Sequence, residues 1–379
     1  MRKRHSSWVP GTGRALVLAW LAVLSFPASG VAGGSWPQFH HDAARTGYDA
    51  SNTALSTENV GKLALEWSYA TGGSVDSPPV EFGGIVYFGS GDGSAYAVSA
   101  TTGKLVWKDA VGGTVLEISV DRGLAFFTSS NGVLYAVNAK TGKQDWTSQV
   151  GASGLQLGAH VEAGGLVVVG SNTGTLYAFR ELTGKKAWTF TIGGYVYTPS
   201  VAGGIVYVGS GNDVFAAVHL TSGKSAWSVK TRTTATGNTV SGGVVYADSD
   251  GGVITALNAM TGKQLWTFTA GAEVRSVPAI AGGVLYDGAY NNDVFALNAK
   301  TGKQLWSTPT GGEVNGSAAV ANGVVYIPSL DANLYALDAT SGKILWHYAT
   351  GARVYSSAGL ANGMVYIGSG DNKVYAFGQ

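Results

Sequence analysis

The sequence contains no cysteine among its 379 residues. This absence excludes disulfide bonds, thiolate metal sites and a lipid anchor attached through cysteine. Charged residues are scarce at 12%. The apolar run at residues 15–26 has twelve residues, short of the roughly 20 that a membrane-spanning helix needs. The composition therefore predicts neither a disulfide-stapled fold nor a transmembrane helix.

The N-terminus has the pattern of a secretory signal peptide at residues 1–32. Arg2, Lys3 and Arg4 precede the apolar run, and small residues follow it up to Ala32, after which we expect cleavage. Loss of four basic residues leaves 20 basic against 23 acidic residues. A slightly acidic mature chain argues against nucleic-acid binding. We expect a secreted, periplasmic or extracellular monomer with no transmembrane segment after cleavage.

Glycine and aromatic residues are abundant, with 57 Gly, 11 Trp and 18 Tyr, which favours turn-rich β structure. Eight tryptophans recur at intervals of 39 to 42 residues: Trp67, Trp107, Trp146, Trp188, Trp227, Trp266, Trp306 and Trp346. A period sustained over most of the chain indicates a repeat architecture. Each unit alternates short β-rich runs with turn residues, and four short strands per 40 residues is the size of a propeller blade.

A tighter regularity sets the register of the repeats. An Ala is followed six residues later by Gly and four residues after that by Trp, as in Ala97, Gly103 and Trp107, and seven copies are complete. The large indole can cover a small residue and a glycine turn of a neighbouring blade. We therefore expect the eight tryptophans to pack between blades.

These repeats resemble the quinoprotein-type propeller family, whose outer strands carry an Ala-x-Asp-x-x-x-Gly-x-x-x-Trp docking motif. The Asp position is relaxed here, since Asn138, Asn258, Asn298 and Asp338 fit the motif whereas Ser99, Arg180 and His219 do not. The resemblance implies an all-β, eight-bladed β-propeller of four-stranded blades over residues 61–379. Trp67 has no preceding Ala, and Ala376 has no following Trp, so we expect residues 65–69 to complete the last blade and close the ring.

Residues 33–60 form an N-terminal extension. It contains the elements Trp36-Pro37 and Arg45-Thr46-Gly47-Tyr48, which are similar to the opening of many exported members of this family. We expect this extension to pack on the propeller, and no catalytic role follows from it.

The stretch after each Trp should adjoin the innermost strand of a blade and line the channel mouth. Seven polar or aromatic residues in these stretches are candidates for ligand binding: Asp76, Glu117, Gln156, Tyr197, Arg275, Asn315 and Tyr355. Loop residues on a rigid scaffold are a common location of function. The alternative is that Asp76, Glu117 and Arg275 are simply solvated loop residues.

Three hypotheses for function remain open. The first is a non-enzymatic exported scaffold that binds a protein, peptide or glycan. The second comes from the resemblance, which includes dehydrogenases that hold pyrroloquinoline quinone and calcium in this position, and the third is a purely structural surface protein. The missing cysteine argues against the lipoprotein role of the barrel-assembly propeller, a further relative by resemblance. We assign no catalytic residue, cofactor or metal, and interpret His40-His41-Asp42 and the turn that begins at Asp248 as structural.

Overall fold

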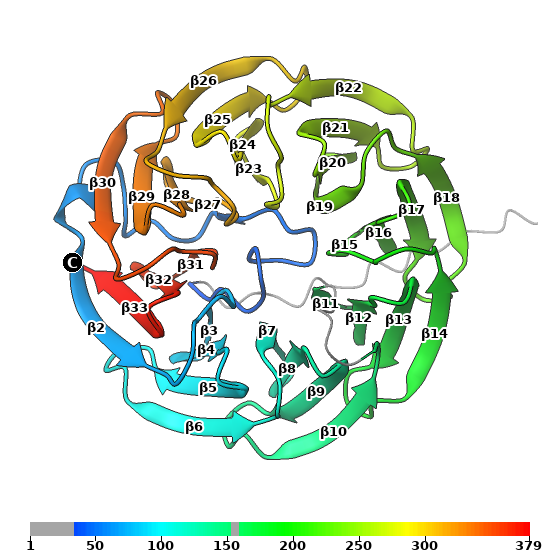
Figure 1. The fold of residues 1–379 in the computed structure, drawn as a ribbon, viewed down its shortest axis with the longest axis horizontal. Coiled ribbons are helices and arrows are strands. Elements are labelled where there is room, and N and C mark those ends of the chain that lie inside the picture. Colours follow the sequence, from blue (N-terminus) through cyan, green and yellow to red (C-terminus); the bar gives the residue numbers. More distant parts are fainter. Residues whose placement is uncertain (1–33, 153–158) are drawn as a thin grey trace, which may run out of the picture. The chain divides into compact units, whose positions relative to one another are not determined.

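The computed structural model of the chain describes residues 34–152 and 159–379. Eight sheets of four antiparallel strands stand side by side in a ring (Figure 1), and one of them carries a fifth strand. The predicted all-β, eight-bladed propeller is confirmed. Within the described ranges, no helix is long and apolar enough to cross a membrane.

The blades are numbered along the chain and their strands are given from the channel outward. Blade 1 comprises β3 (Val80–Phe82), β4 (Ile85–Gly89), β5 (Ser94–Ser99) and β6 (Leu105–Ala110), and blade 2 comprises β7 (Val115–Asp121), β8 (Leu124–Ser129), β9 (Val133–Asn138) and β10 (Gln144–Gln149). Blade 3 comprises β11 (His160–Ala163), β12 (Leu166–Gly170), β13 (Thr175–Arg180) and β14 (Lys186–Thr191), and blade 4 comprises β15 (Ser200–Ala202), β16 (Ile205–Ser210), β17 (Val214–His219) and β18 (Ser225–Lys230). Blade 5 comprises β19 (Ala235–Ser241), β20 (Val244–Ser249), β21 (Val253–Asn258) and β22 (Gln264–Thr269), and blade 6 comprises β23 (Ala279–Ala281), β24 (Val284–Gly288), β25 (Asp293–Asn298) and β26 (Gln304–Pro309). Blade 7 comprises β27 (Ala319–Ala321), β28 (Val324–Pro328), β29 (Asn333–Asp338) and β30 (Ile344–Ala349), and blade 8 comprises β31 (Gly359–Ala361), β32 (Met364–Ser369), β33 (Lys373–Gly378) and β2 (Ala64–Ala70). The remaining elements are β1 (Tyr48–Asp49), which pairs with β27, and the short 3-10 helix η1 (Val60–Lys62).

The repeated tryptophans dock each blade on the next one. The indole of Trp188 in blade 3 lies against Gly223 of blade 4, and its Nε1 donates a hydrogen bond of 2.7 Å to the Leu220 carbonyl. The other seven indoles donate in the same way to backbone carbonyls of the following blade. The Ala of the motif instead pairs in register with the Trp of its own blade, as Ala178 does with Trp188.

The ring is closed by chain ends that are distant in sequence. Strand β2 is the outer strand of blade 8 and pairs with β33, with Trp67 opposite Ala376. Trp346 of blade 7 donates to the carbonyl of Leu63, just before β2. The predicted pairing of the N- and C-terminal strands is confirmed, and it leaves no outer strand missing from blade 8.

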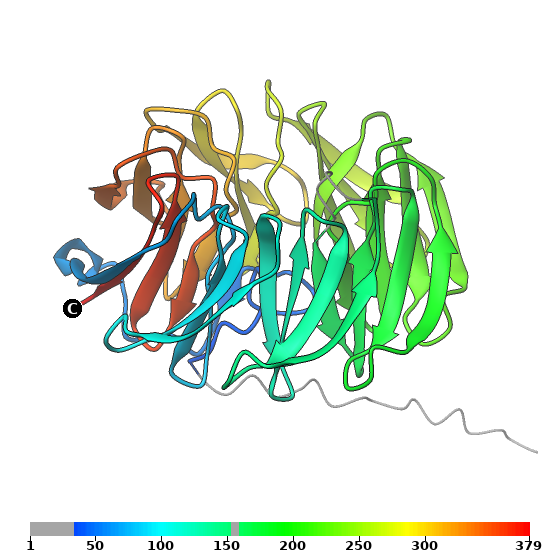
Figure 2. The same ribbon diagram turned by 60° about the horizontal axis from the view of Figure 1, so that its bottom comes forward.

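Residues 36–49, here called the channel segment, cross the centre of the ring (Figure 1) and lie low within it in Figure 2. Trp36 forms an isolated bridge with Glu81 in blade 1. Further along, the segment's carbonyls accept hydrogen bonds from amides on the inner strands of blades 2, 4, 5, 6 and 7, namely Val120, Val201, Val240, Ile280 and Val320. The channel segment therefore satisfies inner-edge amides that would otherwise face the channel.

Candidate functional site

A cavity of about 560 Å³ lies at the centre of the propeller. All eight blades contribute to its wall, mostly through the loops that lead from an outer strand to the next inner strand. Phe39 of the channel segment lines the cavity as well. The cavity is thus bounded by loops and by the segment that crosses the channel.

Five of the seven predicted site residues line this cavity: Asp76, Glu117, Arg275, Asn315 and Tyr355. Tyr197 is not among the lining residues, and its ring lies 4.6 Å from that of Tyr195. Gln156 lies outside the described residues. That these residues bind a ligand stays a prediction.

The rim side chains already make polar contacts with their neighbours. Asp76 accepts a hydrogen bond of 2.8 Å from the Ser74 hydroxyl. Arg275 forms an ion pair of 2.9 Å with Glu273, and the Asn315 amide donates to the hydroxyl of Tyr290. The Arg275 and Glu273 side chains are nearly half exposed, so their pair is open to exchange with a ligand.

Glu117 differs from the other candidates because it is buried, with 5% of its surface exposed. Its Oε1 accepts hydrogen bonds of 3.2 Å from both Nη1 and Nη2 of Arg45, a residue of the channel segment with no exposed surface. Arg45 also donates to the carbonyls of Phe39, Pro199 and His160. The alternative interpretation of Glu117 as a solvated loop residue is wrong, since the carboxylate holds the channel segment to blade 2.

The surroundings of Arg45 contain further buried titratable groups. Burial raises the pKa of Glu117 to about 7, against the opposing attraction of Arg45. Burial raises the pKa of Glu162 to about 8, and burial together with the Arg45 charge lowers the pKa of His160 to about 3. At neutral pH His160 is therefore uncharged, and its Nε2 lies 2.9 Å from the Ser119 hydroxyl. Arg45 is the fixed cation of this cluster.

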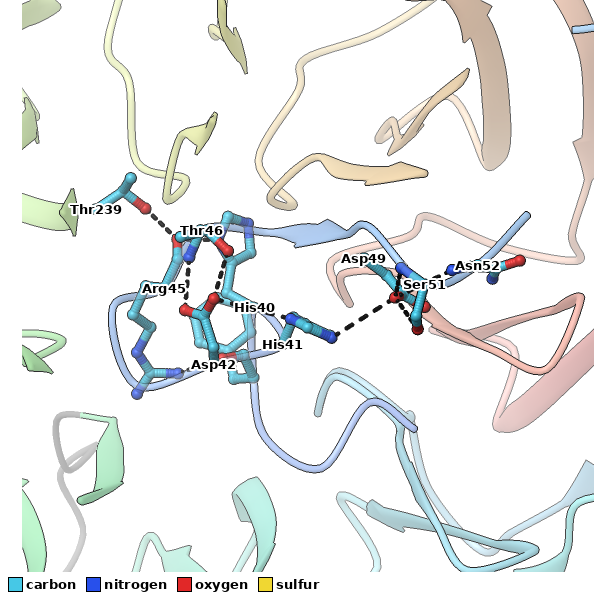
Figure 3. A network of polar contacts seen from close by, with 10 residues as sticks. His40, His41, Asp42, Arg45, Thr46, Asp49, Ser51, Asn52 and Thr239 are labelled. Atoms are coloured by element: carbon cyan, nitrogen blue, oxygen red, sulfur yellow. Dashed lines mark hydrogen bonds and ion pairs between the residues drawn. The ribbon is translucent and has the colours of Figure 1, made fainter. Parts of the chain in front are cut away.

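The channel segment is held in shape by its own polar contacts (Figure 3). The two oxygens of Asp42 accept hydrogen bonds from the amide and hydroxyl of Thr46, at 3.0 and 2.6 Å. Burial lowers the pKa of His40 to about 4, and its Nδ1 donates to the Arg45 carbonyl at 2.8 Å. His40, His41 and Arg45 all have positive φ, a backbone region that costs energy in residues other than glycine. His40, His41 and Asp42 thus serve to fold this segment.

Arg45 was not among the predicted site residues, and Glu117 lies one residue beyond the position that the other candidates occupy in their repeats. The positions equivalent to Asp76, Arg275 and Tyr355 follow a buried apolar residue, and in blade 2 that position is Leu116. Glu117 lies one residue further on, beside a register shift in the pairing of β7 with β8. An alignment of the repeats on Val75, Val115, Val274 and Val354 would have exposed the difference.

Pyrroloquinoline quinone with calcium, which the fold family implies, fits the described lining residues poorly. Calcium takes six to eight oxygen ligands, whereas the described lining residues supply two carboxylates, those of Asp76 and Glu117, and that of Glu117 is bound to Arg45. Among described residues, no group of three or more histidine or acidic side chains could hold a metal ion. Arg275 is the cation among the described lining residues, and one positive charge is little for the three carboxylates of the quinone. We therefore derive no reaction through this cofactor.

Among known proteins, the chain is similar to a quinone-dependent enzyme over a limited region. The 1-butanol dehydrogenase (quinone) of Thauera butanivorans is 27% identical over an alignment of 124 residues, and the match covers 28% of this chain and 20% of the dehydrogenase. The chain thus matches about a fifth of that relative's length.

Three solved structures share the fold over most of the chain. The quinohemoprotein alcohol dehydrogenase from Comamonas testosteroni has a TM-score of 0.79 and 17% identity, and the match covers 94% of this chain and 83% of the other. A europium-containing methanol dehydrogenase has a TM-score of 0.76 and 15% identity, with coverage of 92% and 98%. BamB from Moraxella catarrhalis has a TM-score of 0.72 and 17% identity, with coverage of 84% and 100%. At these identities the similarity establishes the fold.

Family membership comes from the sequence profile described as outer membrane protein assembly factor BamB, which matches residues 42–159, 150–240, 221–318 and 291–379. The matches span the propeller repeats and part of the channel segment, and they confirm the resemblance to quinoprotein-type repeats. The chain therefore belongs to the BamB family of pyrroloquinoline-quinone-type propellers.

Proposed function

We propose that this chain is an exported, non-enzymatic binding protein that holds a segment of a protein or peptide in its central cavity. The observation that carries this proposal is the mixed chemistry of the cavity rim. Asp76, Arg275 and Tyr355 are exposed there and come from blades 1, 6 and 8. An anion, a cation and an aromatic ring on one rigid frame suit a peptide with both charged and apolar side chains.

The burial of Glu117 and its bond to Arg45 support binding rather than proton transfer. Glu117 has the raised pKa of a general base, but its oxygen is hydrogen-bonded to Arg45 and its surface is buried. The description of the family as an assembly factor for outer membrane proteins agrees with a role in protein binding.

Export is part of the proposal and depends on residues 1–32. Their basic start, apolar run and small residues have the signal-peptide pattern. N-terminal sequencing of the protein recovered from the producing cells should begin at Gly33. An intact Met1 on protein retained in the cytoplasm would refute export.

Photocrosslinking in the producing cells tests binding in the cavity. Benzoylphenylalanine in place of Tyr355, a rim residue with 41% exposure, should give a discrete crosslinked species on irradiation. The matched control is the same substitution at Leu182, which is 63% exposed and lies outside the cavity lining. A protein adduct at position 355 and none at 182 supports the proposal. Equal labelling at both positions, or a glycan adduct at 355, refutes a protein or peptide ligand in the cavity.

A quinone-dependent alcohol or sugar dehydrogenase is the second candidate, because the relative that matches part of this chain is a quinone-dependent 1-butanol dehydrogenase. Titration with pyrroloquinoline quinone and calcium, followed by cofactor absorbance and thermal stability, separates the two candidates. Saturable binding with a higher melting temperature that is lost in Asp76→Ala would favour the dehydrogenase. The same result would overturn the non-enzymatic proposal.

A further inference from the structure

A second hollow, of about 440 Å³, lies between blades 4 and 5 and is separate from the central cavity. Val229 of β18 forms one side, and Thr255 of β21 forms the other. None of the six predicted site residues that the structure describes lines it. The repeat pattern explains why the space exists.

At the other blade boundaries the equivalent positions hold aromatic side chains. The residue two positions after each docking Trp faces the residue before the motif Ala of the next blade. Three boundaries have an aromatic residue on both sides, with ring centroids 5.3 to 5.9 Å apart: Tyr69 with Tyr96, Phe268 with Phe295, and Tyr348 with Tyr375. Four boundaries have one aromatic residue at these positions: Tyr135, Tyr177, Phe190 and Tyr335.

The boundary between blades 4 and 5 has neither ring, because Val229 and Thr255 occupy both positions. Its turn differs as well. In blades 1, 7 and 8 the Tyr hydroxyl donates to an aspartate of the turn, namely Asp92, Asp331 or Asp371. In blade 5 the equivalent turn residue is Gly251. Both partners of the Tyr–Asp pair are therefore absent, and the space of an aromatic side chain is left open.

The edge of the hollow is cationic and accessible to solvent. Lys230 and Arg232 line it and are exposed, as are Gln264, Thr267 and Thr269 of β22 in blade 5. The acidic residue among the lining residues is Asp248, but its carboxyl group lies beside that of Asp287 in blade 6 and has no exposed surface. An anionic group at the edge would thus meet two cations without a facing exposed carboxylate among the lining residues.

We propose that the hollow between blades 4 and 5 binds a protein segment that presents an aromatic side chain next to an acidic residue. The ring enters the space that an intramolecular aromatic residue fills at the other boundaries. The acidic residue lies toward Lys230 and Arg232. The lining of this site shares no residue with that of the central cavity, so the site goes beyond the function proposed for that cavity.

Three acetylated and amidated tripeptides test the proposal by calorimetric titration of the full chain: Asp-Phe-Asp, Asp-Leu-Asp and Asn-Phe-Asn. We expect saturable binding of the first peptide and at least about tenfold weaker binding of the other two, because one lacks the ring and the other the charge. Equal binding of all three, or no saturable binding of the first, would overturn the proposal.

Variants that fill the hollow locate the binding. Thr255→Tyr restores the residue found at this position in five other blades. Val229→Phe fills the space from the opposite wall with the residue found two positions after Trp188 and Trp266. Each should weaken Asp-Phe-Asp binding by at least about tenfold and leave the cooperative unfolding transition intact. Arg232→Ala should weaken Asp-Phe-Asp but not Asn-Phe-Asn, whereas Lys224→Ala, which removes a cation outside the lining, should change neither. Unchanged binding in both filled variants would show that the peptide binds elsewhere and would refute this site.

Discussion

Replacement of Arg45 by methionine should produce a stability defect that grows with pH above neutrality. Arg45 has no exposed surface, bonds Glu117 at 3.2 Å and donates to three backbone carbonyls. Removing one partner of a buried ion pair costs about 3 to 5 kcal/mol, because the remaining charge stays buried without compensation. We expect a loss in this range at pH 8.5.

The pH dependence follows from Glu117. Its pKa in the folded protein is about 7 rather than 4.5, so the folded state binds more protons than the unfolded state between these values, and the free energy of unfolding falls as pH rises through this window. The difference between the two pKa values corresponds to a change of about 3 kcal/mol in the free energy of unfolding. Above pH 7 Glu117 no longer changes the free energy of unfolding of the native protein, because it is ionised in both the folded and the unfolded state. In Arg45→Met the pKa of Glu117 rises further, so the variant continues to lose about 1.4 kcal/mol per pH unit.

The assay is denaturant unfolding of both proteins at pH 5.5, 6.5, 7.5 and 8.5 (about one-unit steps, chosen to bracket the folded pKa). The stability difference should be constant at the two lower values and widen at the two higher ones. The control is the double variant Arg45→Met, Glu117→Gln, whose stability difference from the native protein should widen less with pH. Some widening should remain, because Arg45 also lowers the pKa of Glu162. A difference below about 1 kcal/mol at every pH, or one that does not grow above neutrality, would refute the assigned ion pair.

Three further predictions concern blade docking, ring closure and the buried carboxyl pair of Asp248 and Asp287. Trp188→Ala should destabilise the protein by about 3 to 5 kcal/mol because the indole is buried between blades, and a loss under about 1 kcal/mol, or one no larger than that of the exposed Lys186→Ala on the same strand, would contradict docking. Deletion of residues 60–70 removes β2, so light scattering should detect association through the freed edges of blade 8; an unchanged monomer with native melting would disprove this role. Burial and the neighbouring Asp287 raise the pKa of Asp248, so the unfolding free energy of Asp248→Asn relative to the native protein should increase from pH 5 to pH 8, and parallel pH profiles would rule out the pairing.

Repetition explains why much of the fold was predictable. Each Trp, Gly and Ala of the docking motif lies at a fixed spacing within about 40 residues, and the same local solution recurs along the chain. Even the split blade was predictable, because Trp67 lacks a preceding Ala and Ala376 lacks a following Trp. The channel-mouth stretches were found for the same reason, since they follow each Trp at a constant distance.

The site was predicted less well where the repeats deviate from one another. Glu117 resembles a rim residue in sequence, but the register shift in blade 2 places it one position further along the strand and buries it. Arg45 lies in a nonrepeating segment, so no periodicity indicates its orientation. The hollow between blades 4 and 5 likewise depends on two residues, Val229 and Thr255, that are 26 positions apart in sequence and face each other across a blade boundary.

The sequence by itself determined the fold class, the blade number, the docking tryptophans and the closure of the ring, because these depend on local spacing and on a motif repeated along the chain. The tertiary structure alone decided that residues 36–49 cross the channel, that Arg45 meets Glu117 from 72 positions away, and that one blade boundary lacks its aromatic filling. The physical reason is that burial, pKa and free space depend on which side chains from distant segments come together, and spacing along the chain does not specify that.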